Sequence, residues 1–359
     1  MGVQTPTPQA GTGSPLALAG PLTVGDLLDR AFRLYRARFG LFLLTAAVLL
    51  VPIAIISGIF LGGSFGGFMQ NMGQFMTEAT DPDDIPFSMA FDLFGGLYAS
   101  VLLLAVVSAA ANAIANLSLT VQAIEALHGG SLPLMAGLRR GVRRFLPFVG
   151  MMIVQYAAIA AASIVVLIPL VLAGLALVAA AGALFGGNPF ESDGAGGILA
   201  VVGMVGLAIC GYGLAIILVL VPSFYLSARW LVAPTALVAE GTGPIDALRR
   251  SWHLSQGNVL RMVGYLVLIY ILMALFMSVP VMALQWAIMI LMPTEALELA
   301  MTLPTAVSSL ISVFGLPFYV AAIVLLYYDL RIRRESYDLE LRLAEMEEQV
   351  GRDAGARVP

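Results

Sequence analysis

Residues 139–170 read RRGVRRFLPFVGMMIVQYAAIAAASIVVLIPL, four arginines followed directly by a long stretch without a charge. All eighteen basic residues of the chain are arginines, and apolar stretches separate them into four groups. Short cytoplasmic loops of membrane proteins collect Lys and Arg. The pattern therefore predicts a polytopic membrane protein. The groups are Arg30, Arg33, Arg36 and Arg38; Arg139, Arg140, Arg143 and Arg144; Arg229, Arg249, Arg250 and Arg261; and the arginines from Arg331 onward.

Composition supports this class. Hydrophobic residues make up 60% of the chain and charged residues 11%, with a mean hydropathy of +0.95. Soluble domains carry roughly 25% charged residues, so a soluble core does not explain the balance. Because the arginines lie beside apolar stretches and form no single free basic face, no nucleic-acid partner is expected. The single cysteine, Cys210, excludes an intrachain disulfide.

Six apolar stretches are long enough to span a bilayer, which takes roughly 20 residues. The third is too long for one simple crossing and contains Pro169, and the fourth contains Pro222. We predict an all-α transmembrane bundle of six spans, with eight shorter spans as the alternative. Both place the N-terminus and the C-terminus in the cytoplasm. The stretches are 40–62, 97–122, 147–184, 197–227, 260–291 and 304–328.

An internal repeat accompanies the spans. Leu28, Leu138 and Leu248 are 110 residues apart, and an arginine follows each by two positions. A fixed long period indicates one supersecondary unit used three times. We predict three repeats, each an amphipathic helix followed by two spans. The predicted parts are a disordered tail at 1–20, a membrane domain at 21–330 with repeats at about 21–125, 131–235 and 241–330, and a cytoplasmic amphipathic helix and tail at 331–359.

Each amphipathic helix pairs an apolar stripe with arginine and should lie in the membrane interface. The predicted stripes are Val24, Leu27, Leu28, Ala31, Tyr35 and Phe39; Leu134, Leu138, Val142 and Phe145; and Ile245, Leu248 and Trp252. Thr23 can cap the first helix. Each arginine near anionic headgroups contributes about 1 kcal/mol to binding at the membrane surface. We therefore predict lipid-headgroup contacts for Arg30, Arg140 and Arg250.

The second span carries a polar stripe with a spacing of four residues: Ser108, Asn112, Asn116 and Thr120. One interpretation is the lining of a substrate path, and the other is hydrogen bonding between helices. We favour packing, because no charge inside the span accompanies the stripe. Asp329 lies near a span end, four residues before Arg333, which predicts a local ion pair.

No catalytic pattern stands out. His128 and His253 have no matching Cys, Ser or carboxylate cluster, and the chain contains no H-E-x-x-H, Walker or G-x-S-x-G motif. We therefore predict no catalytic residue, no cofactor and no metal site. Abundant Ala and Gly with Arg in place of Lys is typical of a GC-rich bacterial genome, which points to the bacterial inner membrane.

Three stretches together carry a family resemblance: VGDLLDRAFRLYRARFGLFLL (24–44), ARWLVAPTALVAEGTGPIDALRRSWHLSQGNVLRMVGYLVL (228–268) and LLYYDLRIRRESYDLEL (325–341). They resemble the bacterial glycerophosphoryl diester phosphodiesterase membrane-domain family, over most of residues 22–343. In fused members of that family a separate soluble barrel carries the phosphodiesterase chemistry. The resemblance thus implies a membrane domain here and no activity.

Two functions lead, and a membrane-embedded enzyme is a third, weaker candidate. The first is a non-catalytic, multi-pass cell-membrane protein with a structural or regulatory role associated with the envelope or its lipids. The alternative is a transporter or channel for a small molecule or lipid. Membrane lipids are the expected partners, and a second copy of the chain is a further candidate.

Overall fold

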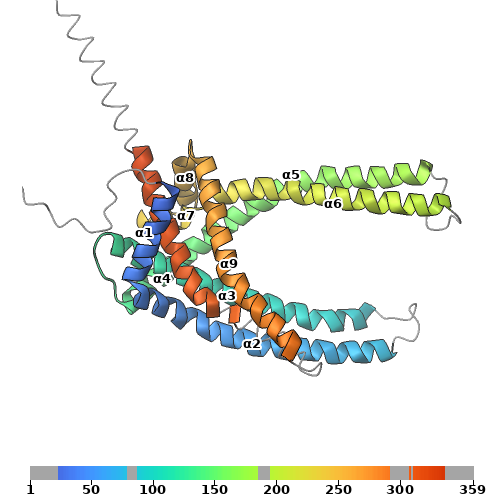
Figure 1. The fold of residues 1–359 in the computed structure, drawn as a ribbon, viewed down its shortest axis with the longest axis horizontal. Helices are drawn as coiled ribbons and strands as arrows, with labels where there is room; N and C mark the ends of the chain where they lie inside the picture. Colours follow the sequence, from blue (N-terminus) through green and yellow to red (C-terminus); the bar gives the residue numbers. More distant parts are fainter. Residues whose placement is uncertain (1–22, 79–86, 185–194, 292–306, 309, 336–359) are drawn as a thin grey trace, which may run out of the picture.

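A computed structural model describes residues 23–78, 87–184, 195–291, 307–308 and 310–335. All regular secondary structure in these ranges is helical (Figure 1). The helices are α1 (Val24–Ala37), α2 (Phe39–Glu78), α3 (Phe87–Leu127), α4 (Leu134–Arg143), α5 (Phe145–Leu184), α6 (Ala195–Arg229), α7 (Ala233–Ala239), α8 (Pro244–Ser255) and α9 (Val259–Leu291), followed by a C-terminal helix at Leu310–Glu335.

Six of these helices are long and apolar enough to cross a membrane, which confirms the predicted all-α fold with six spans. The structure differs from the eight-span alternative, because α5 continues through Pro169 and α6 through Pro222. Proline is tolerated inside transmembrane helices when neighbouring groups satisfy the freed backbone. The 40 residues of α5 extend for about 60 Å at 1.5 Å per residue, about twice the thickness of the hydrocarbon layer.

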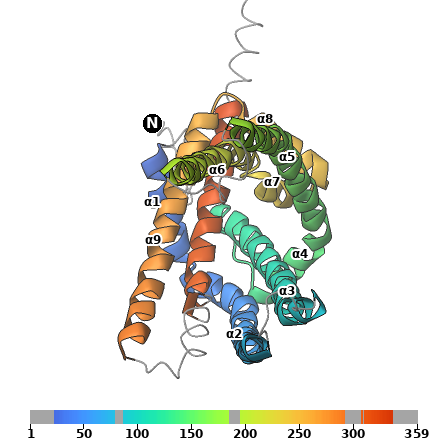
Figure 2. The ribbon, with the colours of Figure 1, turned by 90° about the vertical axis from the view of Figure 1, so that its right-hand side faces the viewer.

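The long helices form three antiparallel pairs. The α2–α3 and α5–α6 pairs run side by side as two separate arms, and an end-on view shows them apart as well (Figures 1 and 2). The third pair joins α9 to the C-terminal helix, where the Tyr265 hydroxyl donates to the Ala322 carbonyl at 3.1 Å. One short helix, α1, α4 or α8, precedes each pair. The repeat boundaries as domains stay a prediction.

The C-terminal helix is the centre of the bundle. In an isolated helix its residues would all face lipid, yet a continuous run of them is buried: Val320, Ala321, Ala322, Ile323, Val324, Leu325, Leu326 and Tyr327. One side packs with Leu27, Met262 and Ile269, and another with Phe42 and Leu119. Arg331–Glu335 continue this helix. The rest of the predicted tail helix, and residues 1–20, lie outside the described residues.

The helix α1 begins where the sequence predicts. The Thr23 hydroxyl accepts from the Asp26 amide at 3.2 Å, and the Asp26 carboxylate accepts from the Thr23 amide at 3.0 Å. This capping box satisfies backbone donors that a helix N-terminus leaves free, and the bonds from Thr23 to the carboxylate lower the pKa of Asp26. Leu27, Ala31 and Leu34 are fully buried. Two residues of the predicted stripe, Leu27 and Ala31, thus pack on protein beside Leu34, which was not predicted, whereas the predicted Phe39 is 41% exposed and begins α2.

The stripes predicted for α4 and α8 need correction. Val142 and Ile245 are each 54% exposed. The buried face of α4 consists of Gly137 and Gly141, because glycine lets the helix backbone approach its neighbour more closely than a branched side chain would. In α8 the predicted Leu248 is buried, together with small residues and leucine: Ala247, Ser251, Leu254 and Ser255.

Candidate functional site at the arginine-bearing end

The short helices α1, α4, α7 and α8 gather at one end of the molecule, on the left in Figure 1, away from the far ends of the two arms. We call this the arginine-bearing end, because α1, α4, α8 and the last turns of the C-terminal helix carry arginines there. Its charged groups make two ion-pair networks and one open cavity. These three features form the candidate site.

The first network centres on Arg250 of α8. Its Nε lies 2.7 Å from Oε1 of Glu240, and its Nη2 lies 2.6 Å from Oε1 of Glu335. The hydroxyl of Tyr327 donates to the same Glu240 oxygen at 2.7 Å, and Arg331 Nε donates to Glu335 Oε2 at 2.7 Å. The network thus ties α8 and the end of α7 to the C-terminal helix.

The protonation of Arg250 follows from these contacts. Partial burial disfavours its charge and acts to lower its pKa, but hydrogen bonds and attraction from Glu240 and Glu335 outweigh burial and raise the pKa. Charge-assisted bonds of this kind are stronger than neutral ones. Arg250 therefore stays a cation and fixes two carboxylates at once.

The second network surrounds Asp329, whose side chain is fully buried. Arg333 Nε lies 3.0 Å from Asp329 Oδ2, which confirms the ion pair predicted from their spacing. Arg261 of α9 adds a pair that the sequence did not predict, with Nη2 at 3.2 Å from the same oxygen. A buried charge needs such partners to offset its desolvation. The carboxylate therefore joins α9 to the C-terminal helix.

The third feature is a partly open cavity of about 310 Å³ between α3, α4 and the end of α7. Three arginines and one glutamate line it, so the lining carries an excess of positive charge. Its apolar wall comes from α3 and α7. The lining residues are Val121, Ile124, Glu125, Arg140, Arg143, Arg144, Val238 and Ala239.

Two glycines place α4 against α3 beside this cavity. A Cβ on Gly137 would meet the Gln122 side chain, with Cδ at 3.0 Å, and a Cβ on Gly141 would lie 2.9 Å from the Ser118 amide nitrogen. The sequence GLRRG at 137–141 is a small-xxx-small pattern of the kind that packs helices closely. This signal is present in the sequence, but the predictions above did not use it.

The three arginines predicted to contact headgroups lie in different surroundings. Arg140 lines the cavity, with Nη1 3.8 Å from Glu125 Oε2. Arg250 is held by its two carboxylates, and Arg30 is half-buried on α1. Headgroup contact stays a prediction for all three. Glu240 and Glu335 were missed, because they lie 10 and 85 residues from Arg250 and no sequence spacing relates them.

The polar stripe of α3 makes hydrogen bonds within its own helix. Asn112 Nδ2 donates to the Ser108 carbonyl at 2.9 Å, and the Thr120 hydroxyl donates to the Asn116 carbonyl at 2.8 Å. Asn112 is exposed, whereas Thr120 is buried. The stripe thus runs from the surface of α3 into the bundle.

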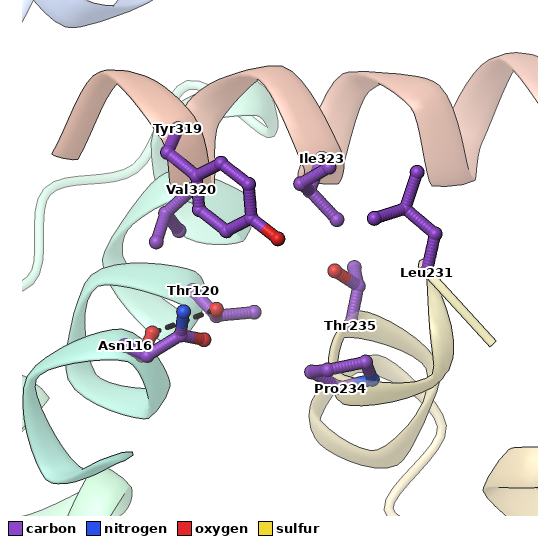
Figure 3. Close-up of a pocket in the computed structure, with 8 residues that line it drawn as sticks. All are labelled: Asn116, Thr120, Leu231, Pro234, Thr235, Tyr319, Val320 and Ile323. Carbon is purple, nitrogen blue, oxygen red and sulfur yellow. Dashed lines mark hydrogen bonds between the residues drawn. The ribbon is translucent and has the colours of Figure 1, made fainter. Parts of the chain in front are cut away.

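At its buried end the stripe reaches a small cavity of about 30 Å³. Figure 3 shows Asn116 and Thr120 on α3 facing Thr235 of α7 and Tyr319 of the C-terminal helix. A cavity of this size holds a water molecule and no larger solute. The packing role and the substrate-path role of the stripe both stay predictions. Within the described residues, His, Cys, Asp and Glu side chains form no group of three that could hold a metal.

Comparison with known families bears on the second half of the chain. Residues 207–350 match the family described as the membrane domain of glycerophosphoryl diester phosphodiesterase. The match confirms the predicted resemblance for the stretches at 228–268 and 325–341, while the stretch at 24–44 lies outside it. No curated protein and no solved structure matches the chain.

The segment that matches this family model contains both ion-pair networks. Glu240, Arg250, Asp329 and Glu335 all fall within residues 207–350. Most of the cavity lining, including Arg140, lies before the matched segment. The networks thus lie within the matched segment, whereas most residues that line the cavity lie outside it.

Proposed function

We propose that this protein is a non-catalytic, multi-pass protein of the bacterial inner membrane with a structural or regulatory role associated with membrane lipids. One observation carries the proposal: six apolar helices meet, at one end, short helices that carry clustered arginines. Exposed arginine beside a span attracts anionic headgroups by about 1 kcal/mol per residue. The carboxylates Glu240, Asp329 and Glu335 are held by arginines, which supports a structural role for them.

Reconstitution tests the association with lipid. The full chain is placed in nanodiscs of phosphatidylcholine alone or mixed with phosphatidylglycerol, and its thermal midpoint is measured in both. We expect a higher midpoint with the anionic lipid, because a ligand that binds the folded state stabilises it. The gain should shrink at high salt, which screens exposed charges. Equal midpoints in the two bilayers would contradict the proposal.

The orientation of the protein is part of the proposal. Clustered arginine in short loops favours the cytoplasmic side, and six spans return the chain to the side where it began. Both termini are therefore placed in the cytoplasm. A single cysteine at Ala136, introduced with Cys210→Ala, should resist a membrane-impermeant thiol reagent in intact cells and react after permeabilisation. Reaction in intact cells would reverse the orientation.

A transporter or channel is the second candidate, and the exposure of Asn112 favours it. An amide on the outer surface of a membrane helix needs a polar neighbour beyond its own backbone bond. Water in a transport path would supply one, and so would a second copy of the chain. A cysteine at Asn112 that reacts readily with water-borne reagents in the reconstituted protein would support the path. An unreactive cysteine would argue against it.

A further inference from the structure

The arginine-lined cavity has features that the ion-pair networks lack. In both networks arginines meet carboxylates at hydrogen-bonding distance. In the cavity, the nearest pair of opposite charges, Arg140 and Glu125, is separated by 3.8 Å, beyond a hydrogen bond. One carboxylate thus faces three guanidinium groups. An anion from outside the chain would balance the excess positive charge of the cavity.

One guanidinium of the cavity is held in place by the backbone. Arg144 Nη1 donates to the Gly241 carbonyl at 3.0 Å. Gly241 has φ of +68°, and a Cβ there would lie 2.9 Å from Arg144 Nη2. Glycine therefore fits both the left-handed backbone and the close guanidinium. Because a carbonyl is neutral, this bond orients Arg144 without cancelling its charge.

We propose that this cavity binds one phosphate-bearing anion at the level of the lipid headgroups. Planar guanidinium groups match the oxygens of phosphate with paired hydrogen bonds. The volume of about 310 Å³ lies at the small end of the range for small-molecule sites. The apolar wall of Val121, Ile124 and Val238 suits the organic part of a phosphate ester. A lipid as the source of the phosphate rests on the proposed function, whereas a soluble phosphate does not.

Binding is measured on the full chain in a neutral detergent. The probes are inorganic phosphate, dihexanoyl phosphatidate and, as a control without net charge, dihexanoyl phosphatidylcholine. The test variant is Arg143→Gln with Arg144→Gln. The matched control is Arg139→Gln, an exposed arginine on the same helix that does not line the cavity. Arg143→Gln alone is a second test variant, because Arg143 is exposed and its replacement spares the bond of Arg144 to Gly241.

We expect the double variant to lose at least about tenfold in affinity, because each guanidinium contributes charge-assisted bonds, while Arg139→Gln stays near the wild type. Binding of phosphatidate only would name a lipid as the source, and binding of inorganic phosphate as well would name a soluble anion. Equal losses in Arg139→Gln and Arg143→Gln would overturn the proposal, since they would indicate a diffuse charge effect. Absence of binding by the wild type would also overturn it.

Failure of the cavity and failure of the proposed function give different results. If the wild type gains stability in phosphatidylglycerol nanodiscs but Arg143→Gln binds phosphatidate as well as the wild type, the cavity proposal falls and the lipid-associated function stands. If the cavity binds phosphate but the nanodisc midpoints are equal, the proposed function falls and the cavity stands.

Discussion

Gly141→Ala tests the close contact between α3 and α4 that places three arginines beside the cavity. The added methyl would overlap Ser118 Oγ and would lie 2.9 Å from the Ser118 amide nitrogen and 3.1 Å from its Cα. The hydroxyl can rotate, but the backbone of α3 cannot, so the two helices must separate. Overpacking a tight contact costs about 1–3 kcal/mol.

Helix propensity offsets part of this cost. Alanine is favoured over glycine inside a helix by about 1 kcal/mol, so the net loss of stability expected for Gly141→Ala is about 0–2 kcal/mol. The matched control is Gly264→Ala in α9, where an added Cβ meets no atom within 4 Å. Gly264→Ala should gain stability from the higher helix propensity of alanine and should lose none through overpacking. Gly141→Ala should therefore be less stable than Gly264→Ala by about 1–3 kcal/mol, the cost of the overpacked contact.

The assay is thermal unfolding in detergent, with urea titration to convert the midpoints into free energies. A Gly141→Ala variant as stable as Gly264→Ala would refute the tight contact. A further check is Ser118→Ala in the Gly141→Ala background. Because the backbone atoms of Ser118 remain in contact, this change should not restore stability. Full rescue would show that only the hydroxyl was in the way.

Two further predictions concern polar groups in the bundle. Asp329→Asn removes the charge that Arg261 and Arg333 share in a buried site and should cost about 3–5 kcal/mol. Asp29→Asn breaks only the exposed ion pair with Arg33 and should cost about 0–0.5 kcal/mol in the same unfolding assay. Equal losses in the two variants would contradict the expectation that the buried ion pair contributes more to stability than the exposed one. Replacing Asn112 and Asn116 together by alanine should lower stability by about 1–3 kcal/mol if they serve packing. Unchanged stability, with ready reaction of cysteines at those positions, would favour the transport path.

The membrane-spanning stretches were predictable from the sequence, because their length and hydrophobicity must match the lipid bilayer around them. The bilayer requires about 20 apolar residues per span, so hydropathy predicted six spans, with eight shorter spans as the alternative. The extent of α5 could not, because Pro169 allows either a break or a continuous helix and only the packed structure shows continuity. The N-cap at Thr23 was predictable, since a capping box is a local interaction.

Which face of each short helix is buried was decided by the tertiary structure. An amphipathic pattern shows that a helix has an apolar side, but Val142 is exposed and Gly141 is buried because α4 packs on α3 through backbone contact. A hydropathy scale does not predict that glycine will form the buried face of a helix. The small-xxx-small spacing from Gly137 to Gly141 was the available signal.

The sequence by itself determined the membrane class, six long apolar stretches and the clustering of arginine, because hydrophobic length and charge placement are properties of consecutive residues. Only the tertiary structure decided which groups most of these arginines contact. Asp329 and Arg333 are four residues apart and could be paired from the sequence. Arg250 and Glu335 are 85 residues apart and meet because the C-terminal helix lies inside the bundle. The cavity around Arg140 likewise exists only where three helices come together, so no local pattern could specify it.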